Sequence, residues 1–296
     1  MYQAGLVLEG GGMKGAYTAG VLDFFLEKKI EFSSVYGVSA GAVHMCSYLS
    51  KQKGRSIRIS TKYIKDPRYC SIWSLLLTGD IFNVKTCYEL IPDKWEPFDH
   101  KTYESYQGKA YAVATNIETG KPEYLLVDEC RSGLQKVRAS ASLPLVSRNV
   151  RIGNKLYLDG GCSDSIPIAK SIMDGNEKNV VVLTKWDAYI CKPASQIGLI
   201  KLRYGKKYSK LVELMKKRHT VYNETIEYLK RLEESGKVFI IRPKKASNVG
   251  RVEKDAKKLQ ALYEEGYEDA KACYEDLLRF LNPSGGINAQ GVQRMI

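Results

Sequence analysis

The residue with the clearest capacity for chemistry is Ser39, at the centre of Gly37-Val38-Ser39-Ala40-Gly41. This pentapeptide follows an apolar run at residues 34–37 and precedes a helix-forming stretch at residues 42–46. A G-x-S-x-G sequence between a strand and a helix is typical of a nucleophile elbow, where a serine on a sharp turn can attack a carbonyl. The amino end of the following helix would place partial positive charge near the developing oxyanion.

A glycine-rich loop, Gly10-Gly11-Gly12-Met13-Lys14-Gly15, separates a predicted strand at residues 4–8 from a predicted helix at residues 16–27. Consecutive glycines leave backbone amides open to a ligand, and such amides can hold an oxyanion or a phosphate. The loop also fits G-x-G-x-x-G, the dinucleotide-binding sequence. That interpretation needs an acidic residue at the end of the second strand. Because Glu31 precedes that strand, the sequence favours the oxyanion interpretation.

Two further segments combine polar residues with small ones. A predicted hairpin, 150–152 with 156–158, delivers Asp159 at a strand end, and Gly160-Gly161 leave room around its carboxylate. An ordinary Asp-Gly turn is the structural alternative. The second segment, R-A-S-A-S-L-P at residues 138–144, is a helix end rich in small residues and stopped by proline.

A serine hydroxyl needs a base to take its proton as it attacks a carbonyl. The chain has three histidines, His44, His100 and His219, and none lies in a sequence typical of a catalytic triad. A carboxylate can replace histidine when it is held close and partly dried, because loss of hydration raises its basicity. Asp159 fits this requirement best, and Asp164 is the alternative base.

In this order and at these separations, the glycine-rich loop, G-V-S-A-G, A-S-A-S-L-P and D-G-G resemble the patatin-like phospholipase family. The segments at residues 157–161 and 164–168 are similar to the bacterial subgroup of small patatin-like hydrolases that carries a C-terminal extension. The motifs cover residues 5–170, and weaker similarity extends to about residue 280.

The resemblance implies a three-layer α/β/α fold with a largely parallel central sheet and a helical C-terminal extension. It also implies a serine–aspartate dyad, with Ser39 as nucleophile and Asp159 as base, and no metal or organic cofactor. The backbone amides of Gly11 and Gly12 would form the oxyanion hole, with Ala40 contributing. The predicted reaction is hydrolysis of carboxylic esters of lipid acyl chains through an acyl-enzyme intermediate.

Lys14 lies in the first turn of the predicted helix, where a cation opposes the helix dipole. Its side chain either extends into water or attracts an anionic substrate headgroup such as a lipid phosphate. The sequence leaves both interpretations open. The apolar run at residues 71–77 also has more than one interpretation: it could line an acyl channel, act as a lid, or form a buried helix.

The 296-residue chain carries a formal net charge of +13, and basic residues concentrate between 201 and 218. Within this segment Leu211, Val212 and Met215 recur at helical spacing. This amphipathic helix either packs its apolar stripe on the core or docks on an anionic membrane. No recognised nucleic-acid module accompanies the charge, so nucleic acid is not an expected partner. A non-catalytic membrane-surface binding protein is the alternative function, but the complete serine, aspartate and glycine motifs argue against it.

We expect a catalytic domain over residues 1–190, a mainly helical extension over 191–281 and a flexible tail over 282–296. Seven cysteines without metal-ligand spacing are typical of free thiols in a reducing compartment. No signal peptide or apolar run of membrane-spanning length is evident. We therefore expect a cytoplasmic protein, with peripheral contact at the inner membrane surface and the oligomeric state left open.

Other elements follow from hydrophobic patterning. A hairpin is predicted over residues 110–114 and 124–127, a buried strand over 180–183 and a late strand over 238–241. Long helices are predicted over about 206–235 and over 253–281.

Overall fold

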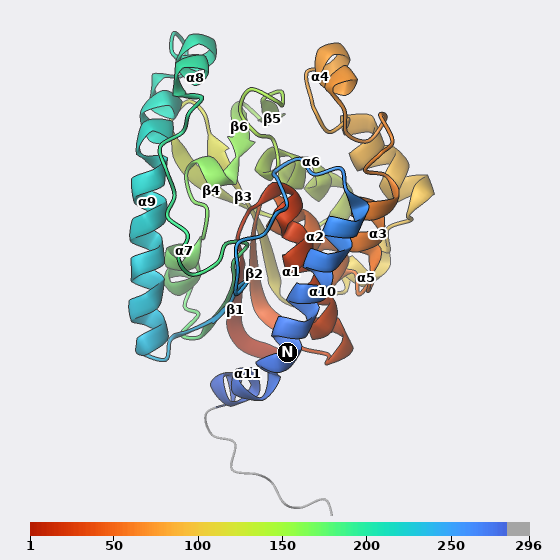
Figure 1. The fold of residues 1–296 in the computed structure, drawn as a ribbon, viewed down its shortest axis with the longest axis vertical. Coiled ribbons are helices and arrows are strands. Elements are labelled where there is room, and N and C mark those ends of the chain that lie inside the picture. The colour runs from red at the N-terminus through yellow and green to blue at the C-terminus, as the bar shows by residue number, and fades with distance from the viewer. Residues whose placement is uncertain (283–296) are drawn as a thin grey trace, which may run out of the picture.

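One eight-stranded sheet organises the computed structural model, which describes residues 1–282 (Figure 1). The strand order is β5-β6-β3-β2-β1-β7-β8, and β4 pairs with β3 off this path. The pairs among β3, β2, β1, β7 and β8 are parallel, whereas β4, β5 and β6 pair antiparallel. The strands are β1 (Tyr2–Leu8), β2 (Phe32–Val38), β3 (Lys109–Asn116), β4 (Lys121–Leu126), β5 (Val150–Ile152), β6 (Lys155–Asp159), β7 (Asn179–Val182) and β8 (Val238–Ile241).

Helices cover both faces of this sheet (Figure 1). The α-helices are α1 (Gly15–Glu27), α2 (Ala40–Leu49), α3 (Arg55–Lys62), α4 (Ile72–Thr78), α5 (His100–Glu104), α6 (Cys130–Ser140), α7 (Ile168–Met173), α8 (Ile197–Tyr204), α9 (Ser209–Glu234), α10 (Ala256–Ala272) and α11 (Tyr274–Leu281). Three shorter or irregular helical turns are η1 (Gly12–Lys14), η2 (Thr86–Trp95) and η3 (Gly160–Cys162).

Alternating side chains of the central strand β1 show which helices belong to which layer. Leu6 and Leu8 pack with α1 and α2 in one buried cluster. Val7 points to the opposite face and packs with residues of α7 and α9. Because successive side chains of a strand point to opposite faces, an apolar strand such as β1 buries both. The predicted three-layer α/β/α arrangement with a largely parallel sheet is confirmed.

The predicted strands are confirmed, and two long helices differ from prediction. The helix expected from residue 206 begins at Ser209, and Lys206 lies in the turn between α8 and α9. The helix expected over 253–281 is divided into α10 and α11 at Cys273. The division lets α11 turn towards the sheet, where the Phe280 ring packs 5.7 Å from the Phe239 ring of β8.

The basic segment 201–218 has its apolar stripe in the interior. Leu211, Val212 and Met215 on α9 are buried together with residues of α8. The core-facing interpretation of this stripe is therefore confirmed, and α9 leaves no such stripe free for a membrane. In contrast, the apolar run 71–77 forms the exposed helix α4, so the buried-helix alternative is wrong.

The C-terminal extension packs directly on the first helix of the chain. α1 is buried along almost its whole length because the sheet covers one side and α10 the other. At this crossing the two helices approach through Gly20 and Gly266, where a Cβ atom would overlap the carbonyl oxygens of Tyr263 and Tyr17 respectively. β8 of the extension also joins the sheet beside β7. The boundary expected at residue 190 stays a prediction, and the expected tail beyond Asn282 lies outside the described residues.

We expect Gly266→Ala to lower the free energy of unfolding by about 1–3 kcal/mol, because the added methyl group must separate two packed backbones. Denaturant unfolding followed by circular dichroism measures this loss. Gly198→Ala on α8 is the matched control, since no atom lies within 4 Å of a Cβ there. This control should change stability by no more than about 1 kcal/mol, and towards greater stability. An equal response of both variants would show that the α1–α10 approach is not tight.

Candidate active site

Ser39 connects β2 to α2 in a backbone conformation that is rare for a residue with a side chain. Its φ is 54° and its ψ is −119°, outside the regions that L-residues normally occupy. The flanking glycines make this turn possible. A Cβ at Gly41 would lie 2.6 Å from the carbonyl oxygen of Leu8, and one at Gly37 would lie 2.6 Å from the Cα of Ala42. The predicted strand–turn–helix context of Ser39 is therefore present.

The strained turn is held by hydrogen bonds from both directions. The Ser39 amide donates to the Ser140 hydroxyl at 2.9 Å, and the Ser39 carbonyl accepts from the Val43 amide at 3.2 Å. Ser140 ends α6 and is fully buried. The segment A-S-A-S-L-P, which the sequence identified only as a small-residue helix end, thus supplies an acceptor for the amide of Ser39.

The sheet register brings Asp159 to Ser39. Val38 pairs with Val113 of β3, and Asp159 pairs with the next residue, Ala114, along the same edge of that strand, since β4 pairs with both residues from the opposite edge. The carboxylate then accepts a hydrogen bond from the Ser39 hydroxyl, with Oγ and Oδ2 2.6 Å apart, although the residues are 120 positions apart in the chain.

Asp159 is fixed by its own hydrogen bonds. Its Oδ1 accepts from the Gly161 amide at 2.8 Å. Its backbone amide donates to the Ser142 carbonyl at 2.7 Å, and its carbonyl accepts from the Thr115 hydroxyl at 2.8 Å. With every one of these atoms paired, the carboxylate has little freedom to turn away from Ser39.

Burial sets the basicity of Asp159. Loss of hydration raises the pKa of its carboxyl from 3.8 to about 6, although the Ser39 hydroxyl, the Gly161 amide and the cations Arg218 and Arg251 lower it. A carboxylate with a pKa near 6 is ionised at neutral pH and still basic enough to accept a proton during catalysis. Its environment therefore suits a general base.

The glycine-rich loop lies against the nucleophile. A Cβ at Gly10 would lie 3.0 Å from the Cβ of Ser39. One at Gly11 would lie 2.6 Å from the Thr184 hydroxyl, and one at Gly12 would lie 2.6 Å from the Arg251 carbonyl oxygen. Gly12 also has a φ of +58°, which favours glycine. Larger residues would push the loop away from its neighbours.

The amides of Gly11, Gly12 and Ala40 stay the predicted oxyanion donors. Ala40 is the first residue of α2, and the first amides of a helix have no acceptor within that helix. The Ser39 amide already donates to the Ser140 hydroxyl, so it is not among the predicted donors.

Sequence reasoning missed Glu9, the residue directly before the glycine loop, whose side chain fixes the start of that loop. This buried carboxylate accepts from the Thr184 amide at 2.5 Å, from the Thr184 hydroxyl at 3.0 Å and from the Tyr222 hydroxyl at 2.8 Å. It thereby links the end of β1 to the end of β7 and to α9. A charged residue directly between an apolar strand and a glycine loop is the signal that could have identified it.

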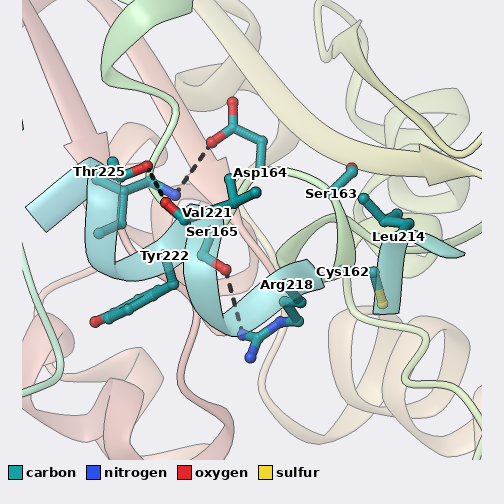
Figure 2. Close-up of a pocket in the computed structure, with 10 residues that line it drawn as sticks. Cys162, Ser163, Asp164, Ser165, Leu214, Arg218, Val221, Tyr222 and Thr225 are labelled. Carbon is teal, nitrogen blue, oxygen red and sulfur yellow. Dashed lines mark hydrogen bonds between the residues drawn. The ribbon is translucent and has the colours of Figure 1, made fainter. Parts of the chain in front are cut away.

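Arg218 is a second residue whose role the sequence did not give. It extends from α9 to the segment after Asp159, where it donates to the Gly161 carbonyl. It also donates to the Ser165 hydroxyl at 3.2 Å (Figure 2). The sequence grouped it with the surface bases of 201–218. Its spacing gave a signal, since it falls three residues after Met215 and four before Tyr222, and both are buried.

The pocket drawn in Figure 2 lies between α9 and residues 162–166. Ser39 and Asp159 are not among its lining residues. The pocket therefore does not contain the dyad.

Other candidate bases are engaged elsewhere. Asp164 accepts from the Tyr124 hydroxyl at 2.8 Å and from the Ile166 amide at 3.3 Å, so it fastens its own loop. His44 is buried on α2 beside Gly15, and burial lowers the pKa of its imidazole to about 4. His100 packs on the Phe98 ring, and His219 has a hydrogen-bond contact with Thr220. Over residues 1–282, Asp159 is the titratable side chain found hydrogen-bonded to Ser39.

Lys14 is half-buried on η1, and burial lowers the pKa of its ammonium, with Glu9 opposing and Arg251 adding to this change. Its predicted contact with a headgroup stays a prediction. No cluster of three or more His, Cys, Asp or Glu side chains arranged to hold a metal ion occurs within residues 1–282.

Comparison with known proteins identifies the family. The profile of patatin-like phospholipase matches residues 6–171, which contain the glycine loop, Ser39 and Asp159. The chain belongs to the patatin-like phospholipase family. The predicted family is confirmed, and membership makes the chain a hydrolase of lipid metabolism. A second profile, a domain of unknown function (DUF6363), matches residues 208–282, from the turn before α9 to the end of α11.

Three relatives show how far the similarity extends. The uncharacterized protein YjjU of Escherichia coli (strain K12) is 26% identical over 245 residues, which are 81% of this chain and 68% of that protein. Lysophospholipase NTE1 of Saccharomyces cerevisiae is 27% identical over 168 residues, 56% of this chain but 10% of the yeast protein. Probable lipid hydrolase 463L of Invertebrate iridescent virus 6 is 25% identical over 195 residues, 60% of this chain and 66% of the viral protein. The matched segment thus spans about a tenth of the length of the yeast enzyme.

Proposed function

We propose that the chain hydrolyses carboxylic esters of lipid acyl chains, with Ser39 as nucleophile and Asp159 as base. One observation carries this proposal: the buried Ser39 hydroxyl donates to the Asp159 carboxylate over 2.6 Å from a strained turn. Relatives named lysophospholipase and lipid hydrolase support a lipid ester as the substrate class.

In the proposed reaction, Ser39 Oγ attacks the ester carbonyl carbon as its proton passes to Asp159 Oδ2. The carbonyl oxygen becomes an oxyanion, which the amides of Gly11, Gly12 and Ala40 stabilise. Collapse of the tetrahedral intermediate expels the alcohol, which takes the proton from Asp159 and leaves an acyl group on Ser39. Water then attacks the acyl-enzyme while Asp159 accepts its proton. As this second intermediate collapses, Asp159 returns the proton to Ser39 Oγ, and the carboxylic acid is released.

An anionic headgroup fits the charges beside the glycine loop. Burial lowers the pKa of both Lys14 and Lys185. Lys185 Nζ donates to the Thr184 hydroxyl at 3.1 Å, and the Arg251 carbonyl accepts from the Met13 amide at 3.1 Å on the other side of the loop. The charges of Lys14, Lys185 and Arg251 lie near one another, and the carboxylate of Glu9 is the negative charge that acts on both lysines. Because these positive charges outnumber the negative charge of Glu9, they would attract a headgroup phosphate to the glycine loop.

We expect Lys14→Met to raise KM for a lysophospholipid about tenfold while leaving KM for an uncharged monoacylglycerol of the same chain length unchanged. A hydrogen bond to a charged group contributes roughly 1.5–3 kcal/mol, which corresponds to a tenfold or larger change in binding. Lys257→Met on the exposed face of α10 is the control and should alter neither substrate. A parallel rise in KM for both substrates would assign Lys14 a structural role.

We expect Ser39→Ala and Asp159→Asn each to reduce kcat for a soluble short-chain ester at least 10³-fold without unfolding the protein, since each removes half of the dyad. Ser39→Ala should also abolish labelling by a fluorophosphonate probe. Asparagine replacements of His44, His100 and His219 are the controls and should keep most activity. Undiminished labelling of folded Ser39→Ala would exclude Ser39 as the nucleophile. An inactive wild-type chain that binds vesicles would favour the alternative of a non-catalytic membrane-binding protein.

The raised pKa of Asp159, about 6, predicts the pH dependence. The base must be ionised to accept the serine proton, so kcat/KM should fall as pH falls through about 6 and become constant above it. The same limb should persist when the three histidines are replaced, because the titrating group is the carboxyl. Initial rates with a short-chain ester between about pH 4 and 9 measure this limb. A limb that disappears with a histidine replacement would contradict the assignment.

A further inference from the structure

Helix α4 has its polar side inward and its apolar side outward. Ser71 and Ser74 are buried: the Ser71 hydroxyl accepts from the Ser74 amide at 3.0 Å, and the Ser74 hydroxyl donates to the Asp80 carbonyl at 2.7 Å. Four large apolar side chains of the helix face solvent and are between 59% and 80% exposed: Ile72, Trp73, Leu76 and Leu77. Exposing four such side chains on one short helix costs solubility unless another phase or partner covers them.

Helix α8 shows a second exposed apolar site with positive charge around it. Leu199 is 57% and Leu202 is 83% exposed. The exposed bases on and directly after this helix are Lys201, Arg203, Lys206 and Lys207. Apolar side chains among lysine and arginine are the composition of a surface that binds an anionic membrane interface.

Both helices stand at one end of the molecule (Figure 1), and residues 143–148 connect them. On the α4 side, the Ile81 amide donates to the Val146 carbonyl at 2.9 Å, and the Arg148 amide donates to the Asp80 carboxylate at 3.0 Å. On the α8 side, Arg203 donates to the Leu145 carbonyl at 3.3 Å. The helices are therefore fixed relative to one another through a shared segment.

The same segment leads directly to the dyad. It follows Ser140, which binds the Ser39 amide, and Ser142, whose carbonyl binds the Asp159 amide. A membrane or partner surface that contacts both α4 and α8 would therefore cover the end of the sheet where Ser39 and Asp159 meet. A lipid ester could then enter the site from that surface.

We infer that α4 and α8 together form a membrane-docking face that inserts Trp73, Leu76, Leu77 and Leu202 into the interface of an anionic bilayer. The bases around α8 bind the lipid headgroups, and the indole of Trp73 lies at the boundary between headgroups and acyl chains, where tryptophan is favoured. The bilayer is preferred over a second copy of the chain because the bases match an anionic surface. The idea that this face delivers substrate rests on the proposed lipid hydrolysis, whereas the docking of the face on a bilayer does not depend on it.

The test uses the full chain and co-sedimentation with phosphatidylcholine vesicles, with and without phosphatidylglycerol. We expect binding that rises with phosphatidylglycerol and weakens in high salt, because exposed charges are screened. The variant Leu76→Ser/Leu77→Ser/Leu202→Ser should weaken binding at least 100-fold, since each buried leucine contributes on the order of tenfold. Lys201→Glu/Lys206→Glu/Lys207→Glu should weaken it on vesicles with phosphatidylglycerol only. Both variants should hydrolyse a soluble short-chain ester at the wild-type rate.

The matched control is Met173→Ser, because Met173 is 82% exposed but ends α7, away from α4 and α8 (Figure 1). It should bind vesicles as the wild type does. Tryptophan fluorescence should shift to the blue on vesicle addition, and Trp73→Phe should lose the shift while keeping the binding.

Equal binding by the wild type and the leucine variant would overturn the inference. So would self-association of the wild type that the leucine variant abolishes without any vesicle binding, since the face would then join two copies. If the wild type does not hydrolyse esters, only the proposed function is refuted. The docking inference is still tested, because vesicle binding is measured without turnover.

Discussion

The hydrogen bond from the Ser39 hydroxyl to the Asp159 carboxylate is the interaction on which the arrangement of this molecule depends. It requires a serine in a strained conformation and a carboxylate removed from water, and both are unfavourable unless neighbouring groups fix them. The sheet provides the fixation by pairing β2 and β6 with consecutive stretches of the same edge of β3, so that Ser39 and Asp159 follow from adjacent register positions. The small residues of G-V-S-A-G, A-S-A-S-L-P and D-G-G allow the backbones to approach closely enough.

The C-terminal extension acts as part of this scaffold. Arg218 binds the segment after Asp159, Tyr222 binds Glu9 below the glycine loop, and the Arg251 carbonyl accepts from Met13 within that loop. α10 packs against α1, and the two helices approach closely at Gly20 and Gly266. The matched family region ends at residue 171, but the contacts that hold its site continue almost to the end of the described chain.

Charge and apolar surface are distributed unevenly around the site. Cations outnumber carboxylates beside the glycine loop. Helices α4 and α8, which carry exposed apolar residues, lie at one end of the molecule (Figure 1). None of the helices within residues 1–282 is long and apolar enough to cross a membrane.

The sequence by itself determined the family, the layered fold and the candidate dyad, because these depend on short motifs that fix local backbone geometry. Glycine runs and strand–turn–helix order are visible in a linear chain, whether or not its distant parts are known. Tertiary structure decided what the charged and apolar residues outside the motifs do. Glu9 proved to be a buried link and Arg218 a partly buried one, and the apolar side of α4 proved to be exposed. Composition gives polarity but not which side of a helix meets the core. The basicity of Asp159 likewise follows from burial, which only the packed chain creates.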